Sequence, residues 1–444
     1  MDFRGAQEYL DSFANYERTR SFEYPEAFDL SRMRSLAKEL GNPQNAYDSV
    51  LIAGSKGKGS TAAYLSSILR MEDVKVGLYT SPHLLSVCER ICINGIPISE
   101  ARFVESALEL RRITDAAEWR RDPPTYFEVL TAMAFKHFKD LKVRWAVIEV
   151  GLGGLYDSTN IAPAKAAAIT PIGLEHTDLL GKTIPKIAVQ KAGIIKGREL
   201  VVSAPQVREA EKVLQDACRE REAELVMVGR ETQVQERWHD EREQAFDVRT
   251  PYGDSYDLRT TLLGEHQIEN AAVAVTLARG LEERARFKVS EAAIKQGVAA
   301  AVWPGRLERV SEAPVVLLDG AHTPDSMRRL LVAVKRHFEG RVVRVVLGLS
   351  RDKDAAAILG ELRAEVAQVV VTEASSPRAL PARELAEAAR AAGLEPELHP
   401  DPERALAAAI ASASPDDVVL VTGSLFLVAD VQRLLPPHRM FGAV

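Results

Sequence analysis

Short apolar runs and longer amphipathic stretches follow one another along the first two thirds of the chain. Apolar runs that predict buried strands occur at 50–53, 75–80, 90–95, 145–150 and 166–170. Helical patterns cover 5–40, 61–69, a stretch that begins at Ser99, and 125–138. Gly41-Asn42-Pro43 should end the second helix of the 5–40 region. This alternation predicts a mostly parallel sheet covered by helices.

The pattern changes near Trp303-Pro304-Gly305-Arg306, where helical periodicity stops at a Pro-Gly pair. Strands and one helix precede this point over 199–263, of which 245–263 has an antiparallel pattern, and another helix opens at 264–272. Beyond it, apolar strands at 315–319, 342–347, 369–372 and 418–422 are separated by Ala-rich helical stretches. We therefore predict an α/β protein with two domains. Residues 1–300 form a P-loop domain with a mostly parallel sheet, and residues 301–444 form a smaller doubly wound, Rossmann-like domain.

A glycine-rich stretch, Ala53 to Thr61, joins the first apolar strand to a helix. Glycines allow backbone N–H groups to approach phosphate oxygens, and the helix start adds the positive end of a dipole. Lys58 would reach the β/γ phosphates, and Ser60 or Thr61 would offer a hydroxyl to Mg²⁺. The usual P-loop has glycine where Ile52 stands and has no residue in the place of Gly59. An ordinary loop-to-helix turn is the alternative, but three glycines around one lysine favour a nucleoside triphosphate site.

Three further polar residues stand within or beside apolar segments. Glu149 lies near the carboxyl end of the 145–150 strand, where ligands gather in parallel sheets, so it is placed to hold Mg²⁺. A carboxylate satisfied by local backbone donors is the alternative. His176 follows the 166–170 strand, although a lone histidine is more often structural. Lys191 lies between apolar residues, and a buried lysine must lose its charge or find a partner. Carbamylation by CO₂ is one such route.

Composition and charge describe an ordinary soluble protein, with 46% hydrophobic and 27% charged residues and a net charge of −6. Neither a nucleic-acid surface nor a membrane surface is indicated, and no apolar run approaches the ~20 residues of a membrane helix. Cys88, Cys92 and Cys218 lack the spacing of a zinc site or disulfide framework, so we expect reduced thiols. The N-terminus has no apolar signal region. We expect a cytoplasmic location.

The ordered motifs together resemble the folylpolyglutamate synthase and dihydrofolate synthase family, within the Mur ligase group, over nearly the whole chain. The motifs that carry the resemblance are Gly57-Lys58-Gly59-Ser60, residues 78–84, Glu89-Arg90-Ile91, Tyr126-Phe127-Glu128, residues 149–154, His176-Thr177-Asp178 with Leu180-Gly181, residues 191–196, residues 303–308, Asp319-Gly320-Ala321-His322 and Thr422-Gly423-Ser424-Leu425. The phosphate loop alone is moderately specific, whereas the ordered set is highly specific.

The resemblance implies an ATP-dependent ligase that adds L-glutamate to a folate or dihydropteroate carboxylate through an acyl phosphate. It implies that Gly57, Lys58, Gly59, Ser60 and Thr61, together with Asn270, Arg306 and Asp319, bind ATP. It implies two Mg²⁺ ions held by Ser60, Ser81, Glu149, His176 and carbamylated Lys191. It places Thr125, Phe127 and Asp157 at the pterin and His322 and Ser424 near glutamate. Lys58, Glu149, His176 and Lys191 would be the catalytic set. We expect a monomer with small-molecule substrates, whose reaction takes place in the cleft between the domains.

Four departures from the family pattern bear on substrate preference and not on the reaction class. Ser55-Lys56 stands where the family usually has Thr-Asn, Leu155-Tyr156 where it has Arg-Leu, Thr323 where asparagine is common, and Phe426 where tyrosine is common. Three other functions stay open: a Mur-type ligase with a different acceptor, a small-molecule kinase, and a nucleotide-binding regulator without catalysis. Whether one or both synthase activities are present, the preferred folate and the glutamate chain length are not determined by the sequence.

Overall fold

The computed structural model describes residues 1–17 and 29–435, and the chain divides into two compact units. The first comprises Met1–Arg237, Phe246–Arg259 and His266–Ala301; the second comprises Trp238–Ala245, Thr260–Glu265 and Val302–Val444. The main break therefore lies one residue from the predicted division at 300 and 301. Two short segments that the prediction assigned to the first domain group with the second. The part of the predicted helical region 5–40 that covers 18–28 lies outside the described residues.

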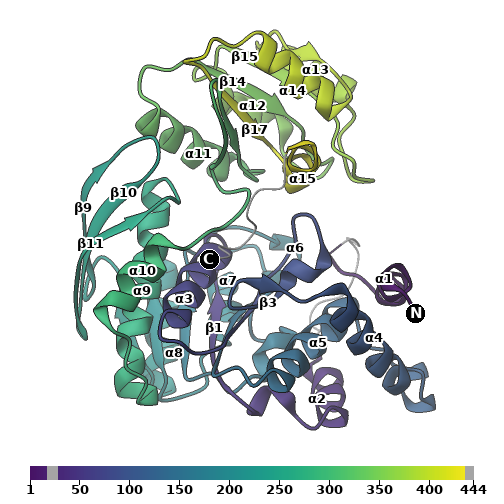
Figure 1. The fold of residues 1–444 in the computed structure, drawn as a ribbon, viewed down its shortest axis with the longest axis vertical. Helices are drawn as coiled ribbons and strands as arrows, with labels where there is room; N and C mark the ends of the chain where they lie inside the picture. The colour runs from purple at the N-terminus through teal and green to yellow at the C-terminus, as the bar shows by residue number, and fades with distance from the viewer. Residues whose placement is uncertain (18–28, 436–444) are drawn as a thin grey trace. The chain divides into compact units, whose positions relative to one another are not determined.

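The first unit, in which Figure 1 labels β1 and β3, is built on an eight-stranded sheet. The order of its strands is β4-β3-β2-β5-β1-β6-β7-β8. The strands are β1 Asp48–Ala53, β2 Val76–Tyr79, β3 Ile91–Ile93, β4 Ile96–Pro97, β5 Trp145–Glu149, β6 Ala166–Ile169, β7 Leu200–Ser203 and β8 Glu224–Met227. Strands β2, β5, β1, β6, β7 and β8 pair in parallel, while β3 and β4 form an antiparallel edge. The predicted mostly parallel sheet is confirmed, and β1, which leads into the glycine-rich stretch, occupies an interior position.

Helices surround this sheet. They are α1 Phe3–Asp11, α2 Leu30–Glu39, α3 Lys58–Arg70, α4 Glu100–Thr114, α5 Tyr126–Asp140, α6 Thr177–Leu180, α7 Ile184–Ala192, α8 Arg208–Glu220, α9 Glu265–Ala285 and α10 Glu291–Ala299. Helix α2 ends where the sequence predicted, because Gly41 and Asn42 both take positive φ values that a helix cannot continue. A small sheet of β9 Gln233–His239, β10 Gln244–Thr250 and β11 Gly253–Thr260 precedes α9.

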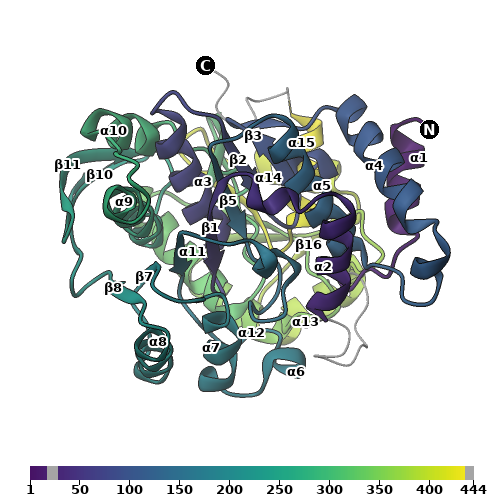
Figure 2. The same ribbon diagram turned by 90° about the horizontal axis from the view of Figure 1, so that it is seen from below.

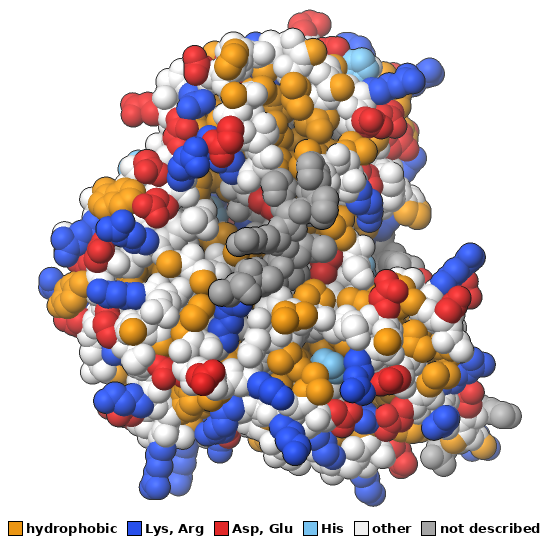
Figure 3. All heavy atoms as spheres, viewed as in Figure 1, with side chains coloured by type: hydrophobic (Ala, Val, Ile, Leu, Met, Phe, Trp, Pro, Cys, Tyr) orange, Lys and Arg blue, Asp and Glu red, His pale blue; other side chains and the backbone are white. Residues whose placement is uncertain are grey.

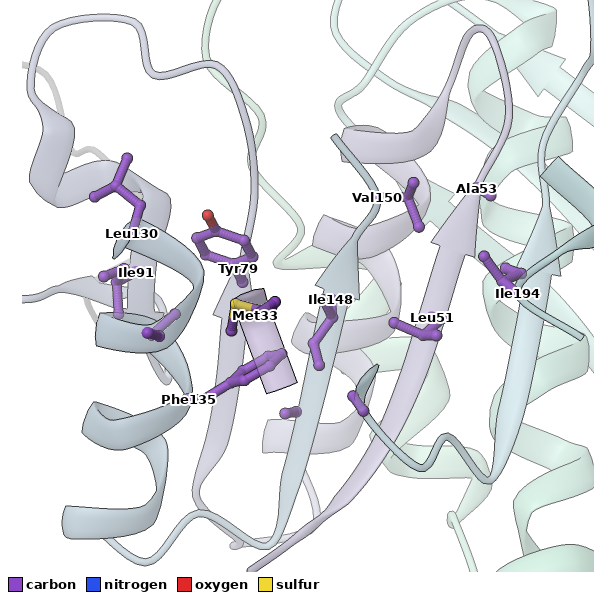
Figure 4. Packing of buried hydrophobic residues seen from close by; sticks show 14 of the residues in the cluster. Met33, Leu51, Ala53, Tyr79, Ile91, Leu130, Phe135, Ile148, Val150 and Ile194 are labelled. Atoms are coloured by element: carbon purple, nitrogen blue, oxygen red, sulfur yellow. The ribbon is translucent and has the colours of Figure 1, made fainter. Parts of the chain in front are cut away.

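The core explains why the strands read as uninterrupted apolar runs. Leu51, Tyr79 and Ile148, from three neighbouring strands, belong to one buried cluster with Leu130 and Phe135 of α5 (Figure 4). The β1 residues that alternate with Leu51, at positions 50 and 52, are fully buried as well. Because both faces of the sheet are covered, neither face of a strand can be polar.

The second unit is a six-stranded sheet of order β12-β13-β17-β14-β15-β16. Its strands are β12 Glu308–Glu312, β13 Val315–Leu318, β14 Val343–Leu347, β15 Gln368–Val371, β16 Glu397–Leu398 and β17 Val418–Thr422. Its helices are α11 Pro324–His337, α12 Ala355–Leu362, α13 Ala382–Ala391, α14 Pro402–Ala411 and α15 Leu425–Leu434. The prediction found the four central parallel strands. It missed β12, a half-buried antiparallel edge strand, and β16, a two-residue strand, because neither carries an apolar run.

The surface and the cysteines agree with the composition. Basic and acidic side chains are interspersed on the face shown in Figure 3. Cys88, Cys92 and Cys218 are buried free thiols, as predicted. Among the described residues, no helix is long and apolar enough to cross a membrane.

Helix α3, which follows the glycine-rich stretch, lies directly against α10 (Figures 1 and 2). The approach is close at Gly297 of α10, where an added Cβ would lie 2.3 Å from the Cα and 2.7 Å from the backbone N of Ile68. Backbone atoms cannot move aside as a flexible side chain can. Gly297 therefore permits the contact that supports α3.

We predict that Gly297→Ala lowers the free energy of unfolding by about 1–3 kcal/mol, because the methyl group must push the two helices apart. Gly360→Ala is the control, since Gly360 also lies within a helix but a Cβ there meets nothing within 4 Å. That change should instead stabilise its unit by roughly 0.5–1 kcal/mol through helix propensity. Calorimetric unfolding of both variants measures the difference. A Gly297→Ala protein as stable as the parent would mean that α3 and α10 are not in backbone contact.

Candidate active site

The glycine-rich stretch forms a loop at the carboxyl end of β1, and it is tied to the loop that follows β6. The backbone N–H of Ser55 donates to Pro171 O at 2.9 Å, and the Ser55 hydroxyl donates to Gly173 O at 3.1 Å. Gly54 has a φ of +147°, and a Cβ there would lie 1.9 Å from Thr170 Oγ1. Only glycine fits this approach. We call residues 53–61 the phosphate loop.

The phosphate loop ends at the N-terminus of α3. Gly57, with φ +86°, is the residue before the first helical turn. Helix geometry leaves the N–H groups of Lys58, Gly59 and Ser60 without acceptors inside the helix. These groups, together with the helix dipole, make an anion-binding site. The predicted nucleotide-binding residues 57–61 therefore lie where phosphate oxygens can be held.

Asn270 of α9 lies against this loop, although 209 positions separate it from Thr61. The Thr61 hydroxyl donates to Asn270 Oδ1 at 3.4 Å, and Asn270 Nδ2 donates to Gln267 Oε1 at 3.1 Å. A Cβ on Gly57 would lie 2.3 Å from Asn270 Oδ1. The structure thus brings Asn270 to the predicted nucleotide site.

Two lysines meet at the carbonyl oxygen of Gly54. Lys58 Nζ donates to this oxygen at 3.1 Å and Lys191 Nζ, from α7, donates to it at 2.7 Å. Lys191 also forms an ion pair with Glu175 Oε1 at 2.8 Å. Lys191 is 1% exposed, so its charge is held almost entirely by the Glu175 carboxylate and the Gly54 carbonyl.

Burial, opposed by Glu175 and aided by nearby Lys58, lowers the pKa of Lys191 to about 8. Burial alone would raise the pKa of Glu175, but Lys58 and Lys191 hold it below its ordinary value. The neutral amine of Lys191 is therefore accessible near neutral pH. Glu175 had no predicted role. Its position directly before His176 in a strand-end loop is the signal that could have identified it.

Glu149 and Ser81 come together at the ends of neighbouring strands. Glu149 ends β5 and is opposite Ile52 in the register of β1, beside the phosphate loop. Its Oε2 accepts a hydrogen bond from Ser81 N–H at 3.0 Å. His176 follows β6 in a left-handed conformation, next to Glu175. Within the described part of the chain, no three His, Cys, Asp or Glu residues converge on one metal position.

The oxygen-bearing side chains of Glu149 and Ser60 nevertheless fit Mg²⁺. Mg²⁺ prefers oxygen ligands and is usually bound by one or two carboxylates, substrate phosphates and water. The Glu149 carboxylate and the buried Ser60 hydroxyl lie at the same end of β5 and β1 as the phosphate loop. A full cluster of protein ligands is not required there.

The three residues predicted to contact the pterin have structural roles of their own. Thr125 caps α5 in a reciprocal pair with Glu128. Phe127 packs against Gly151, where a Cβ would lie 2.6 Å from the ring. The Asp157 carboxylate accepts from Leu152 N–H at 2.8 Å, and burial raises the pKa of Asp157. Phe127 and Asp157 therefore both contact the loop that follows β5.

Glu89 and Arg90 order the loop that carries Ser81, a role that the motif alone did not reveal. Glu89 accepts hydrogen bonds from three consecutive backbone N–H groups, at positions 84–86. Buried Arg90 donates to His83 Nδ1 at 2.9 Å and forms a bidentate pair with Glu17 at 2.7 Å. Buried Arg90 and the Glu89 carboxylate therefore hold the segment after β2 in one conformation.

The remaining predicted residues belong to the second unit. Asp319 follows β13, and its carboxylate accepts from Leu307 N–H at 2.9 Å and Ala321 N–H at 2.8 Å. Burial raises the pKa of Asp319, and nearby Arg306 opposes the shift. His322 Nδ1 lies 2.7 Å from Gly320 O, which can only accept, so Nδ1 carries the proton.

Ser424 lies at the end of β17, the strand next to β13, and its hydroxyl caps α15 by accepting from Phe426 N–H. The Phe426 side chain is 45% exposed, so it does not pack into the core. Thr323, the other departure in this region, caps α11 together with Ser326. Asp319, His322 and Ser424 thus gather at one sheet edge.

A phosphate loop at the end of an interior parallel strand and a second α/β unit with polar groups at its strand ends define an ATP-dependent ligase of the Mur type. Residues 52–278 match the Mur ligase middle domain, and residues 305–425 match the Mur ligase glutamate ligase domain. The chain belongs to the folylpolyglutamate synthase and dihydrofolate synthase family.

Individual relatives support this placement over the whole chain. The dihydrofolate synthase/folylpolyglutamate synthase of Bacillus subtilis is 32% identical, covering 91% of this chain and 94% of that protein. The folylpolyglutamate synthase of Lacticaseibacillus casei is 33% identical, covering 98% and 99%. The folylpolyglutamate synthase of Mycobacterium tuberculosis complexed with ADP superposes with a TM-score of 0.87 at 32% identity, covering 98% of each chain. Membership in this family makes the protein an ATP-using ligase with small-molecule substrates.

We predict that Gly57→Ala abolishes detectable ATP binding, because the new Cβ meets Asn270 and the left-handed backbone disfavours alanine. Gly340→Ala is the matched control. Gly340 has a φ of +76°, similar to the +86° of Gly57, but nothing lies within 4 Å of its Cβ position. The control should lose roughly 1 kcal/mol of stability and keep its ATP affinity. Calorimetric titration with ATP compares the two; equal affinities would contradict the assigned loop.

Proposed function

We propose that this ligase joins L-glutamate to the carboxylate of a folate or of dihydropteroate. The observation that carries the proposal is the likeness over nearly the full chain to synthases of this kind. One solved structure of a folylpolyglutamate synthase (FPGS), an FPGS–AMPPCP–folate complex, superposes with a TM-score of 0.83. Phe127 and Asp157, which both contact the loop after β5, are the proposed pterin contacts. His322 and Ser424 are the proposed glutamate contacts.

The reaction needs ATP because a carboxylate is a poor acyl donor. Attack of the substrate carboxylate on the γ-phosphorus gives an acyl phosphate and releases ADP. The glutamate amine then attacks the acyl carbon, and phosphate leaves through a tetrahedral intermediate. Each step moves negative charge over phosphate oxygens, so catalysis depends on positioned positive groups.

The chain supplies these groups from the phosphate loop. The N–H groups at the start of α3 hold phosphate oxygens, and the Lys58 ammonium moves from the Gly54 carbonyl to the β/γ phosphates. Asn270 contacts the nucleotide next to Gly57. Arg306 and Asp319 also contribute to nucleotide binding. A small-molecule kinase would release the phosphorylated compound as its product. This ligase instead passes the acyl group of the phosphorylated intermediate to an amine.

Ser60, Ser81, Glu149, His176 and Lys191 are the proposed holders of two Mg²⁺ ions. When bound, Mg²⁺ neutralises charge on the transferring phosphoryl group. Glu149 provides a carboxylate whose orientation is set by Ser81 N–H. Ser60 provides a hydroxyl from the first turn of α3.

Lys191 would act as an anion after carbamylation. Its amine attacks CO₂ and loses a proton, which gives a carbamate. Carbamylation requires the neutral amine, and a pKa of about 8 supplies this form at a useful fraction near neutral pH. The ion pair with Glu175 is the competing, unmodified state.

The substrate assignment predicts one glutamate added per cycle to dihydropteroate, a reduced folate, or both, detected by mass spectrometry of the products. Lys58→Ala should reduce this turnover by about 10²-fold or more, since it removes a phosphate clamp and no packing. Its far-UV circular dichroism and melting temperature should match the parent. Stable phosphorylated products without an amide would favour a kinase, and normal turnover of folded Lys58→Ala would contradict the phosphate site.

The carbamylation proposal predicts that Lys191→Ala is inactive and regains part of its activity with millimolar acetate or formate, which replace the lost anion. Lys191→Arg should stay inactive, because guanidinium cannot be carbamylated and repels Mg²⁺. Lys58→Ala serves as the control, because a lost cation is not restored by a carboxylate. Equal rescue of Lys58→Ala and Lys191→Ala, or an active Lys191→Arg, would exclude the carbamate.

A further inference from the structure

Helix α9 passes from one unit of the chain to the other without interruption. Its first residue, Glu265, groups with the second unit, and its remaining residues, from His266, group with the first. The helix has 21 residues. A continuous helix is stiff, so the position of its first turn constrains the residues of the next turns.

The start of α9 is held by His337, the last residue of α11. Gly264 N–H donates to His337 Nε2 at 3.1 Å, and His337 Nδ1 lies 2.7 Å from Asp240 O. An amide N–H can only donate and a carbonyl can only accept. The ring is therefore neutral, with its proton on Nδ1, and it joins two segments that are 24 positions apart in sequence.

Two further contacts within the second unit hold the same helix end. Gln244 Nε2 donates to Leu262 O at 2.7 Å and to Gly264 O at 3.0 Å. Arg336, the neighbour of His337 on α11, forms an ion pair with Glu265. His337 is 3% exposed and Gln244 is fully buried, so the loss of either hydrogen-bonding group would leave buried partners unsatisfied.

Asn270 lies six positions after Gly264, which is about 9 Å along a helix. Asn270 is the α9 residue that packs against Gly57 and accepts from Thr61 in the phosphate loop. Fewer than two helical turns thus separate the segment held by His337 from the side chain at the nucleotide site.

We propose that His337 is a positioning residue for ATP binding: it fixes the first turn of α9 and thereby sets Asn270 against the phosphate loop. The proposal rests on the nucleotide site proposed above. It assigns a role in nucleotide binding to a residue that lies 67 positions after Asn270 and acts through the first turn of α9.

The test compares four variants of the full chain by calorimetric titration with ATP and by thermal unfolding. His337→Phe keeps a ring but loses both hydrogen bonds. His337→Gln keeps one donor and one acceptor. Val334→Ala removes a buried side chain of the same helix that belongs to the second unit's apolar core. Asn270→Ala removes the contact at the phosphate loop.

We expect His337→Phe to raise the Kd for ATP by about 5- to 10-fold, in the range typical of coupled sites. His337→Gln should restore most of the affinity. Val334→Ala should lower the melting temperature comparably and leave the Kd unchanged. The double variant His337→Phe/Asn270→Ala should bind no more weakly than Asn270→Ala, because both changes act through one contact.

Equal Kd values for His337→Phe and Val334→Ala would overturn the inference, since the histidine would then be only structural. An unchanged Kd in Asn270→Ala would overturn the nucleotide contact of Asn270 as well as the inference built on it. If His337→Phe does not fold, Arg336→Ala takes its place in the test, because it removes the exposed ion pair with Glu265 at the same helix end. Arg336→Ala should then raise the Kd by a smaller factor, and an unchanged Kd would count against the proposal.

Discussion

The nucleotide end of the first unit depends on how closely two backbone segments approach each other at Gly54. The ends of β1 and β6 lie so near that a single Cβ on Gly54 would fall 1.9 Å from Thr170 Oγ1. This approach lets Ser55 bond to the residues after β6 and directs the Gly54 carbonyl toward two lysines. A side chain at this point would separate the strand ends and remove the shape of the phosphate loop.

Buried charge is the second constraint on the site. A lysine as buried as Lys191 loses most of its hydration, and one carboxylate with one carbonyl compensates only in part, so its pKa falls to about 8. The second unit contains a buried group of the opposite charge, Asp319. Its carboxylate is held by two backbone N–H groups. Both charges lie where parallel strands end, the place at which such folds bind ligands.

Much of the fold could be predicted because its strands are buried on both faces. Leu51 and its neighbours form runs that no exposed strand would tolerate. The glycine-rich loop could be recognised because its chemistry is local. Edge strands such as β12 could not be found, since a half-buried edge has no distinctive pattern. The grouping of 238–245 and 260–265 with the second unit also depends on contacts such as that of His337, far away in sequence.

The sequence by itself determined the order of the buried strands and the main helices, the phosphate loop, and the family through its ordered motifs. Those features depend on neighbouring residues, and a local pattern records them. Only the tertiary structure decided the partners: Glu175 for Lys191, Asn270 for Gly57 and Thr61, and Gly264 for His337. Thr61 and Asn270 are 209 positions apart, and Lys191 and Gly54 are 137 apart. No local periodicity specifies such a pair, because it forms only when separate elements pack against one sheet.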